Sequence, residues 1–256
     1  MTKGKIYLIG FGPGDYDNMT HRAVNAIKEC EVIVGYKTYI NLIKPQLEGK
    51  EVITTGMQGE VERAQIAVEK AITGNTVAVV SSGDAGIYGM AGLVYEILKA
   101  NEPPEEKFPD IETIPGITAL NGVASILGAP LMHDFVGISL SDLLTPWEII
   151  EKRVNLAGEG DFVIALYNPQ SKKRDWQLEK TRDILLQYRN PKTPVGVVKS
   201  AYRKNENIDI VTLQTMCEVE VGMLTTIIIG NSTSYVYRNK IITPRGYHTK
   251  YDLTSE

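Results

Sequence analysis

The stretch Lys5-Ile-Tyr-Leu-Ile-Gly-Phe-Gly-Pro-Gly14 is a short apolar run followed at once by a glycine-rich turn. Similar apolar runs recur along the chain and alternate with segments whose apolar positions have helical spacing. We expect strands at 5–9, 31–34, 51–53, 76–80, 134–140, 161–166, 194–198, 208–211 and 224–229. This alternation predicts an α/β fold with mostly parallel strands.

The expected helices and loops divide the chain into two halves. Apolar residues repeat at helical spacing over 61–71 and 90–98, and Thr145 is the expected N-cap of a helix with Pro146 at its first position. The second half is richer in strands and more mixed in strand direction. We expect two α/β domains, 1–114 and 115–240, and a C-terminal tail over 241–256.

Composition excludes several classes of protein. The 256 residues carry a net charge of −4, unlike a dedicated nucleic-acid binder, which would be basic. Cys30 and Cys217 lie too far apart in sequence for a disulfide framework or a paired-cysteine metal site. No apolar run approaches the roughly 20 residues that span a bilayer, and the start of the chain does not have the pattern of a signal peptide. We expect a cytoplasmic protein with neither nucleic acid nor membrane as a partner.

The glycine turn does not fit the usual nucleotide-binding patterns. The dinucleotide fingerprint requires glycine at position 15, where this chain has Asp15. Pro13 also removes a backbone N–H that a pyrophosphate would need. The turn alone could therefore be a tight connection without a ligand.

Four other expected strand ends are also rich in small residues: Ser81–Gly89, Pro115–Ala119, Leu166–Pro169 and Met223–Thr226. Small residues let a ligand approach the backbone closely. In α/β sheets, ligands bind outside the carboxyl ends of the strands. Together these segments predict a binding site.

In this order the segments resemble the tetrapyrrole methylase superfamily. The resemblance rests on Gly10–Gly14 with Met19-Thr20, Gly83-Asp84 with Ile87-Tyr88-Gly89, and Pro115–Ala119. It implies a two-domain α/β fold with its active site in the interdomain cleft. It also implies S-adenosylmethionine as methyl donor, a tetrapyrrole substrate and a homodimer.

Further blocks resemble the branch that methylates carbon 17 of precorrin-3B, or of cobalt-factor III, with ring contraction during cobalamin biosynthesis. They are Val34–Ile40, Ser81–Ala91, His133–Phe135 with Ile138–Glu148, and Asp161–Pro169 with Ser171–Arg174. The alternative is an enzyme of the same superfamily that methylates RNA or a diphthamide precursor. An RNA enzyme should have a basic groove, whereas the basic residues here occur only in short, scattered groups.

The resemblance also implies which residues bind the methyl donor: Pro13, Gly83, Asp84, Ile87, Thr118, Ala119, Asn168, Ala201 and Thr226. Asp84 has an alternative interpretation as a turn-forming residue whose side chain binds the backbone.

The substrate carries many carboxylates while the protein is acidic, so recognition requires locally placed bases. The candidates are Lys37, Arg63, Arg153 and Arg174, although each could equally be a solvated surface charge.

Ser139, Ser141 and Asp142 are expected to hydrogen-bond the macrocycle, with Ser141 and Asp142 in the catalytic set. The alternative is that they only shape the loop before Pro146. His133 is a candidate acid or base, or else a structural histidine. We expect no protein-bound metal, because any cobalt belongs to the substrate.

Overall fold

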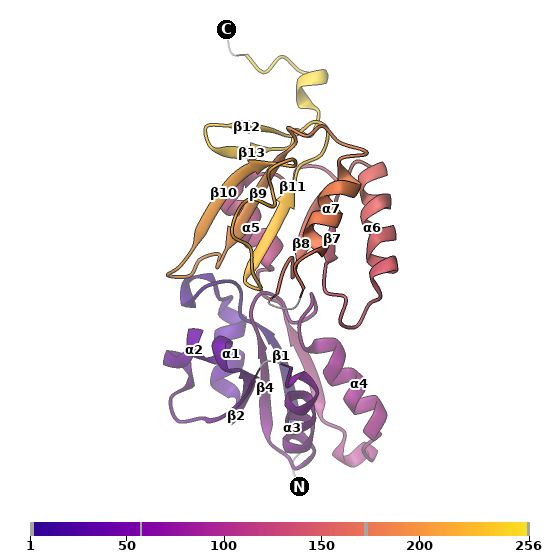
Figure 1. Cartoon of the computed structure of the whole chain (residues 1–256). Coiled ribbons are helices and arrows are strands. Elements are labelled where there is room, and N and C mark those ends of the chain that lie inside the picture. The colour runs from indigo at the N-terminus through magenta and orange to yellow at the C-terminus, as the bar shows by residue number, and fades with distance from the viewer. Residues whose placement is uncertain (1–2, 57, 172–173, 255–256) are drawn as a thin grey trace. The chain divides into compact units, whose positions relative to one another are not determined.

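The computed structural model describes residues 3–56, 58–171 and 174–254 (Figure 1). The chain divides into two compact units, Met1–Ala119 and Leu120–Glu256. Each unit contains a five-stranded sheet with helices packed on it, so the expected α/β class is confirmed. The expected boundary at 114/115 lies at the end of strand β5 (Asp110–Ile114), and the one at 240/241 lies inside β13 (Lys240–Ile242).

The sheet of the first unit is entirely parallel, with strand order β3-β2-β4-β1-β5. Its other strands are β1 (Lys5–Gly10), β2 (Val32–Tyr36), β3 (Glu51–Thr55) and β4 (Thr76–Ser81). All four of these were expected from the sequence. Because the strands run the same way, their carboxyl ends meet at one edge of the sheet.

Helices cover both faces of this sheet, as a buried parallel sheet requires. Alternate residues of β1 supply the two faces. Ile6 and Leu8 pack with α3 (Glu60–Ile72) and α4 (Ala91–Asn101), whereas Tyr7 and Ile9 pack with α1 (His21–Glu29) and α2 (Lys37–Leu42). The two helices expected over 61–71 and 90–98 are confirmed as α3 and α4.

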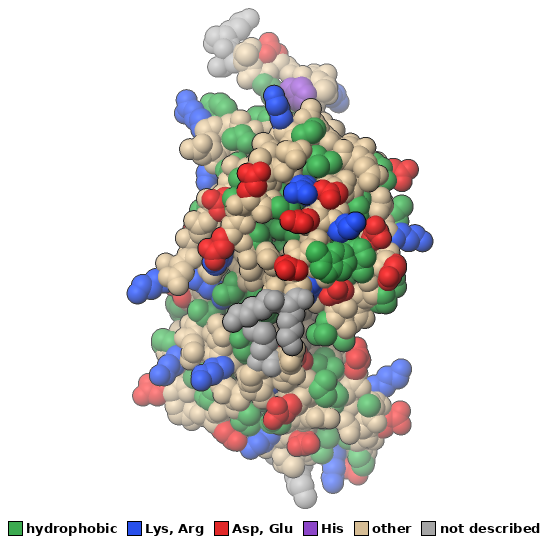
Figure 2. Space-filling model, viewed as in Figure 1, with side chains coloured by type: hydrophobic (Ala, Val, Ile, Leu, Met, Phe, Trp, Pro, Cys, Tyr) green, Lys and Arg blue, Asp and Glu red, His purple; other side chains and the backbone are tan. Residues whose placement is uncertain are grey.

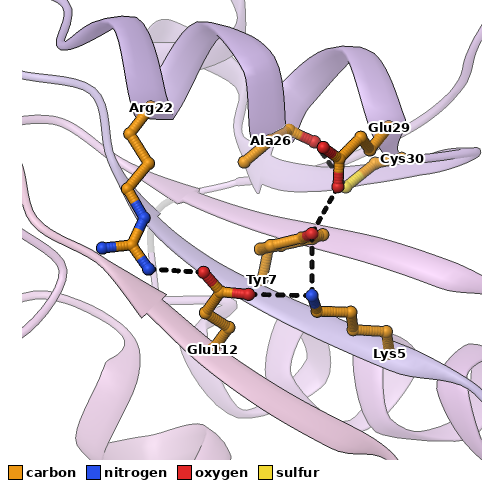
Figure 3. A network of polar contacts seen from close by, with 7 residues as sticks. All are labelled: Lys5, Tyr7, Arg22, Ala26, Glu29, Cys30 and Glu112. Carbon is orange, nitrogen blue, oxygen red and sulfur yellow. Dashed lines mark hydrogen bonds and ion pairs between the residues drawn. The ribbon is translucent and has the colours of Figure 1, made fainter.

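Polar side chains join β1, β5 and α1 on the α1 face (Figure 3). The Lys5 amine donates hydrogen bonds of 2.8 Å to the Tyr7 hydroxyl and to the Glu112 carboxylate. Tyr7 in turn donates to Glu29, and Arg22 donates to Glu112 at 2.5 Å. The bonds from Lys5 and Arg22 lower the pKa of Glu112. These contacts lie along the strands and stabilise the packing of α1.

The sheet of the second unit has mixed direction and strand order β10-β9-β11-β8-β7, as expected. β8 is parallel to β7, whereas β11 is antiparallel to both β8 and β9, and β10 is antiparallel to β9. The bounds are β7 (Phe135–Ser139), β8 (Val163–Tyr167), β9 (Pro194–Lys199), β10 (Asn207–Thr212) and β11 (Thr225–Ile229).

Helix α5 (Ala119–Leu127) packs on one face of this sheet, while α6 (Trp147–Glu159) and α7 (Gln177–Leu185) pack on the other. A small additional sheet joins β6 (Gly128–Ala129), β13 and β12 (Tyr235–Tyr237). Strands β5, β6, β12 and β13 were not expected from the sequence.

The predicted N-cap of α6 is wrong. The helix begins at Trp147, its N-cap is Pro146, and no side-chain hydrogen bond caps it. Pro146 has φ −53° and ψ 142°, which is extended rather than helical backbone. Because Pro146 is itself extended, the helix starts one residue later than expected and Pro146, not Thr145, takes the cap position.

On the face visible in Figure 2, acidic and basic side chains lie interspersed. An RNA-binding face is expected to be mainly basic, so this face does not favour the RNA alternative. No helix within residues 3–56, 58–171 and 174–254 is long and apolar enough to cross a membrane.

Candidate active site

Three strand ends of the first unit meet through glycine backbone, and we call Gly10, Gly12, Gly83 and Gly116 the glycine junction. Gly12 and Gly83 exchange two main-chain hydrogen bonds, at 3.0 and 2.9 Å. These bonds join the loop after β1 to the loop after β4. Gly83 has φ +72°, a left-handed conformation that favours glycine.

A side chain at this junction would collide with main chain. A Cβ placed on Gly10 would lie 2.7 Å from the carbonyl oxygen of Gly83. A Cβ on Gly116 would lie 2.2 Å from the same oxygen. The ends of β1, β4 and β5 can therefore approach this closely only because these positions are glycine.

The Asp84 side chain stabilises the glycine junction through hydrogen bonds to main chain. Its Oδ1 accepts the N–H of Gly86 at 2.8 Å, and its Oδ2 accepts the N–H of Gly116 at 3.0 Å. Both carboxylate oxygens are thus bound to main chain, which matches the alternative interpretation of Asp84 as a turn residue. The carboxylate ties the loop after β4 to the end of β5.

The remaining predicted donor residues of this unit lie in the same three loops. Pro13 is buried after β1, and Thr118 and Ala119 are half-buried after β5. Ile87 is exposed after β4, beside Tyr88, which has the left-handed φ of 53°. The structure therefore brings together all six donor residues predicted in the first unit, at one edge of the sheet.

Arg63 is held inside the first unit. Its side chain is only 5% exposed and donates hydrogen bonds to the Thr55 hydroxyl and to the Gly56 carbonyl oxygen, the latter at 2.9 Å. It also makes an ion pair of 3.2 Å with Glu60. The guanidinium thus fixes the end of β3 to the start of α3. Lys37, by contrast, is exposed at the first position of α2.

In the second unit, predicted site residues again gather at one sheet edge. Ser139 ends β7, Asn168 follows β8 and Ala201 follows β9. Since β11 is antiparallel to β8 and β9, its first residues, including Thr226, lie at the same edge. The structure brings these four residues together from four different strands.

The backbone is strained at this edge. Asn168, Ser200 and Tyr202 have φ of 50°, 55° and 58°, which non-glycine residues rarely adopt. Side-chain bonds hold these loops: the Asn168 amide donates to Ser139 Oγ at 3.1 Å, and the Tyr202 hydroxyl lies 2.6 Å from Ser125 Oγ. Strain of this kind clusters at functional sites, where the surrounding structure maintains it.

Ser141 and Asp142 are held by two side chains that precede or begin α7. Arg174 Nη1 donates to Ser141 Oγ at 3.0 Å, and Gln177 Nε2 donates to Asp142 Oδ2 at 2.8 Å. Arg174 Nη2 also donates to the carbonyl oxygen of Asn168 at 2.8 Å. We call Ser139, Ser141, Asp142, Arg174 and Gln177 the serine–aspartate cluster.

Burial affects the Arg174 side chain of this cluster. Desolvation lowers the pKa of Arg174, and the nearby Asp142 carboxylate opposes that shift. Arg174 Nε and Gln177 Oε1 are buried and have no hydrogen-bond partner among the described residues. Unpaired buried polar atoms are costly, so they mark a place where a ligand or water could complete the network.

Two predicted residues lie away from the cluster. His133 precedes β7, whereas Ser139 ends it, and the four steps from Phe135 to Ser139 along the strand span roughly 13 Å. The His133 side chain is half exposed, and its Nδ1 accepts the N–H of Asp134 at 2.9 Å. Arg153 is exposed in the middle of α6. The structure does not bring His133 together with Ser141 and Asp142.

Sequence reasoning missed Gln177. It lies on the buried face of α7 with Leu178, Thr181, Ile184 and Leu185. A polar amide on the apolar face of a helix is a signal that could have identified it. Within the described residues, no group of three or more histidine, cysteine or acidic side chains could hold a metal ion.

Known proteins resemble this chain along most of its length. Residues 5–217 match the sequence model of the family described as Tetrapyrrole (Corrin/Porphyrin) Methylases. The probable cobalt-factor III C(17)-methyltransferase of Salmonella typhimurium is 52% identical over 242 residues, which cover 94% of this chain and 99% of that relative.

A longer relative and a solved structure give similar matches. The cobalt-factor III methyltransferase of Priestia megaterium is 55% identical over 251 residues, 98% of this chain. This chain spans only 46% of that relative's length. The crystal structure of the methyltransferase CobJ matches with a TM-score of 0.88 and 38% identity, covering 94% of this chain and 100% of that one.

Proposed function

Because the chain belongs to the tetrapyrrole (corrin/porphyrin) methylase family, we propose that it methylates carbon 17 of cobalt-factor III or of metal-free precorrin-3B. The methyl donor is S-adenosylmethionine, and ring contraction accompanies the transfer during cobalamin biosynthesis. The observation that carries this proposal is the 52% identity to the Salmonella relative over 99% of its length. Since the names of both relatives specify cobalt-factor III, the cobalt form is the first substrate to test.

The glycine junction suits a donor bound mainly by main chain. S-adenosylmethionine supplies a methyl group already activated by the positive sulfur, so the protein must chiefly align the reactants and exclude water. Gly83 and Gly116 leave peptide groups without covering side chains. The Asp84 carboxylate fixes the peptide N–H groups of Gly86 and Gly116 by accepting a hydrogen bond from each.

We assign the donor to the two sheet edges described above. In the first unit the residues are Pro13, Gly83, Asp84, Ile87, Thr118 and Ala119, and in the second they are Asn168, Ala201 and Thr226. The left-handed backbone at Asn168 and beside Ala201 supports the assignment in the second unit. The location of the active site in the interdomain cleft stays a prediction from the resemblance.

The serine–aspartate cluster is the proposed contact for the tetrapyrrole. Within the described residues Asp142 Oδ1 has no hydrogen-bond partner, because Gln177 binds only Oδ2. Asp142 can therefore accept a proton or a hydrogen bond at Oδ1, while Arg174 places a positive charge close to the carboxylates of the substrate.

The other basic candidates divide by exposure. Lys37 and Arg153 are exposed, and a contact of either with peripheral carboxylates of the substrate stays a prediction. Arg63 already binds Thr55, Gly56 and Glu60, so we assign it the task of fixing the end of β3. We leave His133 out of the mechanism because β7 separates it from the cluster.

The test is incubation of the protein with S-adenosylmethionine and either cobalt-factor III or precorrin-3B, followed by mass spectrometry. We expect a product that has gained one methyl group and has a contracted ring. A Gly83→Val variant that still folds is the control, because a β-branched side chain is incompatible with φ +72° and should abolish donor binding. Absence of a methylated product from both substrates would refute the proposed function.

We also propose that the protein works as a homodimer in the cytoplasm. The support is the resemblance to the family. Small-angle scattering should give a particle of twice 28.3 kDa at micromolar concentration. A particle of 28.3 kDa would contradict the dimer.

A further inference from the structure

Gln177 is buried in a place where an apolar residue would fit more simply. It is 1% exposed, and its neighbours on the same helix face include Leu178 and Leu185. Burial of a carboxamide is costly unless hydrogen bonds compensate it. Its Oε1 has no partner among the described residues, so that cost is only partly recovered.

The amide of Gln177 has one hydrogen-bond partner among the described residues, the Asp142 carboxylate. Nε2 donates to Oδ2 at 2.8 Å, across 35 positions of sequence. This bond fixes the orientation of the Asp142 carboxylate. The other oxygen, Oδ1, has no hydrogen-bond partner in the described part of the chain.

The start of α7 is a rigid support for this bond. The ring of Trp176, directly before Gln177, contacts the ring of Trp147 at the start of α6, with centroids 4.8 Å apart. Thr181 adds a hydrogen bond of 2.8 Å to the carbonyl oxygen of Gln177. The position of Gln177 is therefore set by helix packing rather than by the loop that carries Asp142.

We propose that Gln177 is a positioning residue, which orients the Asp142 carboxylate so that Oδ1 meets the tetrapyrrole. Gln177 itself does not touch the substrate. The inference rests on the proposed function, because it names a residue that prepares the same site. It accounts for a buried amide that helix packing alone does not require.

Two substitutions and one control test the proposal. Gln177→Leu removes the hydrogen bond and keeps an apolar side chain at the buried position. Gln177→Glu places a second carboxylate against Asp142, and the two groups can stay in contact only while they share a proton. Ile184→Val is the matched control, because this buried residue lies on the same helix face and has no side-chain hydrogen bond to lose.

For each protein we would measure kcat and KM for the tetrapyrrole over a range of pH, donor Kd by calorimetry, and thermal unfolding. For Gln177→Leu we expect kcat to fall on the order of tenfold to a hundredfold, as for a misplaced reactive group. Donor Kd should stay the same. Ile184→Val should retain wild-type kcat even if its stability falls.

Gln177→Glu gives a result that a merely structural role would not produce. While the pair holds one proton, the introduced carboxyl group can donate to Asp142, so turnover should be retained at low pH. As pH rises and the shared proton is lost, the two carboxylates repel and turnover should fall. The wild type should lack this decline.

An exchange variant separates position from charge. In the double variant Asp142→Asn, Gln177→Glu, the amide at position 142 donates and the carboxylate at position 177 accepts. The double variant should therefore recover the free energy of unfolding that Asp142→Asn or Gln177→Glu alone loses. Turnover should remain low because the carboxylate is no longer at position 142. Full recovery of turnover in the exchange variant would overturn the proposal.

Wild-type kcat and an unchanged pH profile in both Gln177→Leu and Gln177→Glu would also overturn it. Those results differ from a failure of the proposed function, in which the wild type itself would methylate neither tetrapyrrole. In that case the positioning role falls as well. If Gln177→Leu does not fold, the pH profile of kcat in Gln177→Glu tests the proposal alone. A fall in kcat with rising pH would support it, and a profile like that of the wild type would overturn it.

Discussion

Replacing Gly116 with alanine tests whether the glycine junction requires main chain without side chains. The added Cβ would lie 2.2 Å from the carbonyl oxygen of Gly83 and 2.5 Å from that of Gly10. Real Cβ atoms essentially never approach within 3.0 Å, so the Gly83 contact alone must open by at least 0.8 Å, the difference between 3.0 and 2.2 Å. Both neighbours are main-chain atoms and cannot rotate away.

The cost follows from this displacement. Overpacking typically destabilises by about 1–3 kcal/mol, and we expect Gly116→Ala to lower the free energy of unfolding by that amount. The loops after β1 and β4 must move by nearly the same distance. A misplacement of about 1 Å can reduce a rate on the order of a hundredfold, so methyl transfer should fall steeply even in the folded variant.

Equilibrium unfolding in urea and calorimetry with S-adenosylmethionine provide the assays. Gly92→Ala is the control: no atom lies within 4 Å of its added Cβ, and the residue is inside α4. Alanine is favoured over glycine there by about 1 kcal/mol, so this variant should be at least as stable as the wild type. If Gly116→Ala matches the wild type in both stability and donor affinity, the reasoning from close approach is refuted.

Three further predictions concern single side chains. Asp84→Asn should lower the free energy of unfolding by about 1–3 kcal/mol, because an amide nitrogen cannot accept a main-chain N–H; an unchanged urea midpoint would contradict this. Asp142→Ala should lower kcat with donor Kd unchanged in steady-state kinetics, whereas unchanged turnover would mean that Asp142 only shapes its loop. Burial raises the pKa of the Cys30 thiol to about 12, whereas an unfolded cysteine titrates near about 8.5. The thiol's contribution to stability is therefore complete below about pH 8.5 and is lost as pH rises toward 12. Between about pH 7 and 10, the free energy of unfolding measured in urea should fall less in Cys30→Ala than in the wild type. An equal fall in both proteins would refute the assignment to Cys30.

The sequence predicted every strand of the two five-stranded sheets except β5, and it missed all three strands of the small additional sheet. Strand β1 is an apolar run because neighbouring strands and helices cover it on all sides. Strand β5 is an edge strand whose Glu112 faces Lys5 and Arg22, and three of its five residues are polar, so it gave no comparable apolar run. In β12 all three residues are exposed, and nothing in their pattern indicates burial.

The candidate site was also predicted only in part. Glycines at strand ends were predictable because few other residues tolerate such conformations and contacts. The internal hydrogen bonds of Arg63 and the contact of Gln177 with Asp142 depend on elements that meet only in the folded chain. His133 and Ser141 are near neighbours in sequence, yet an extended strand carries its two ends apart.

The glycine junction also limits how this enzyme could change by mutation. Its contacts run between peptide groups, which every amino acid shares, so a substitution there can break the arrangement but offers no new chemical group in return. The serine–aspartate cluster is built from side chains, and each can be exchanged for another of different charge or length. Selection for a new substrate, or directed evolution in the laboratory, should therefore find its useful variants in the serine–aspartate cluster of the second unit. The glycine junction of the first unit should stay unchanged.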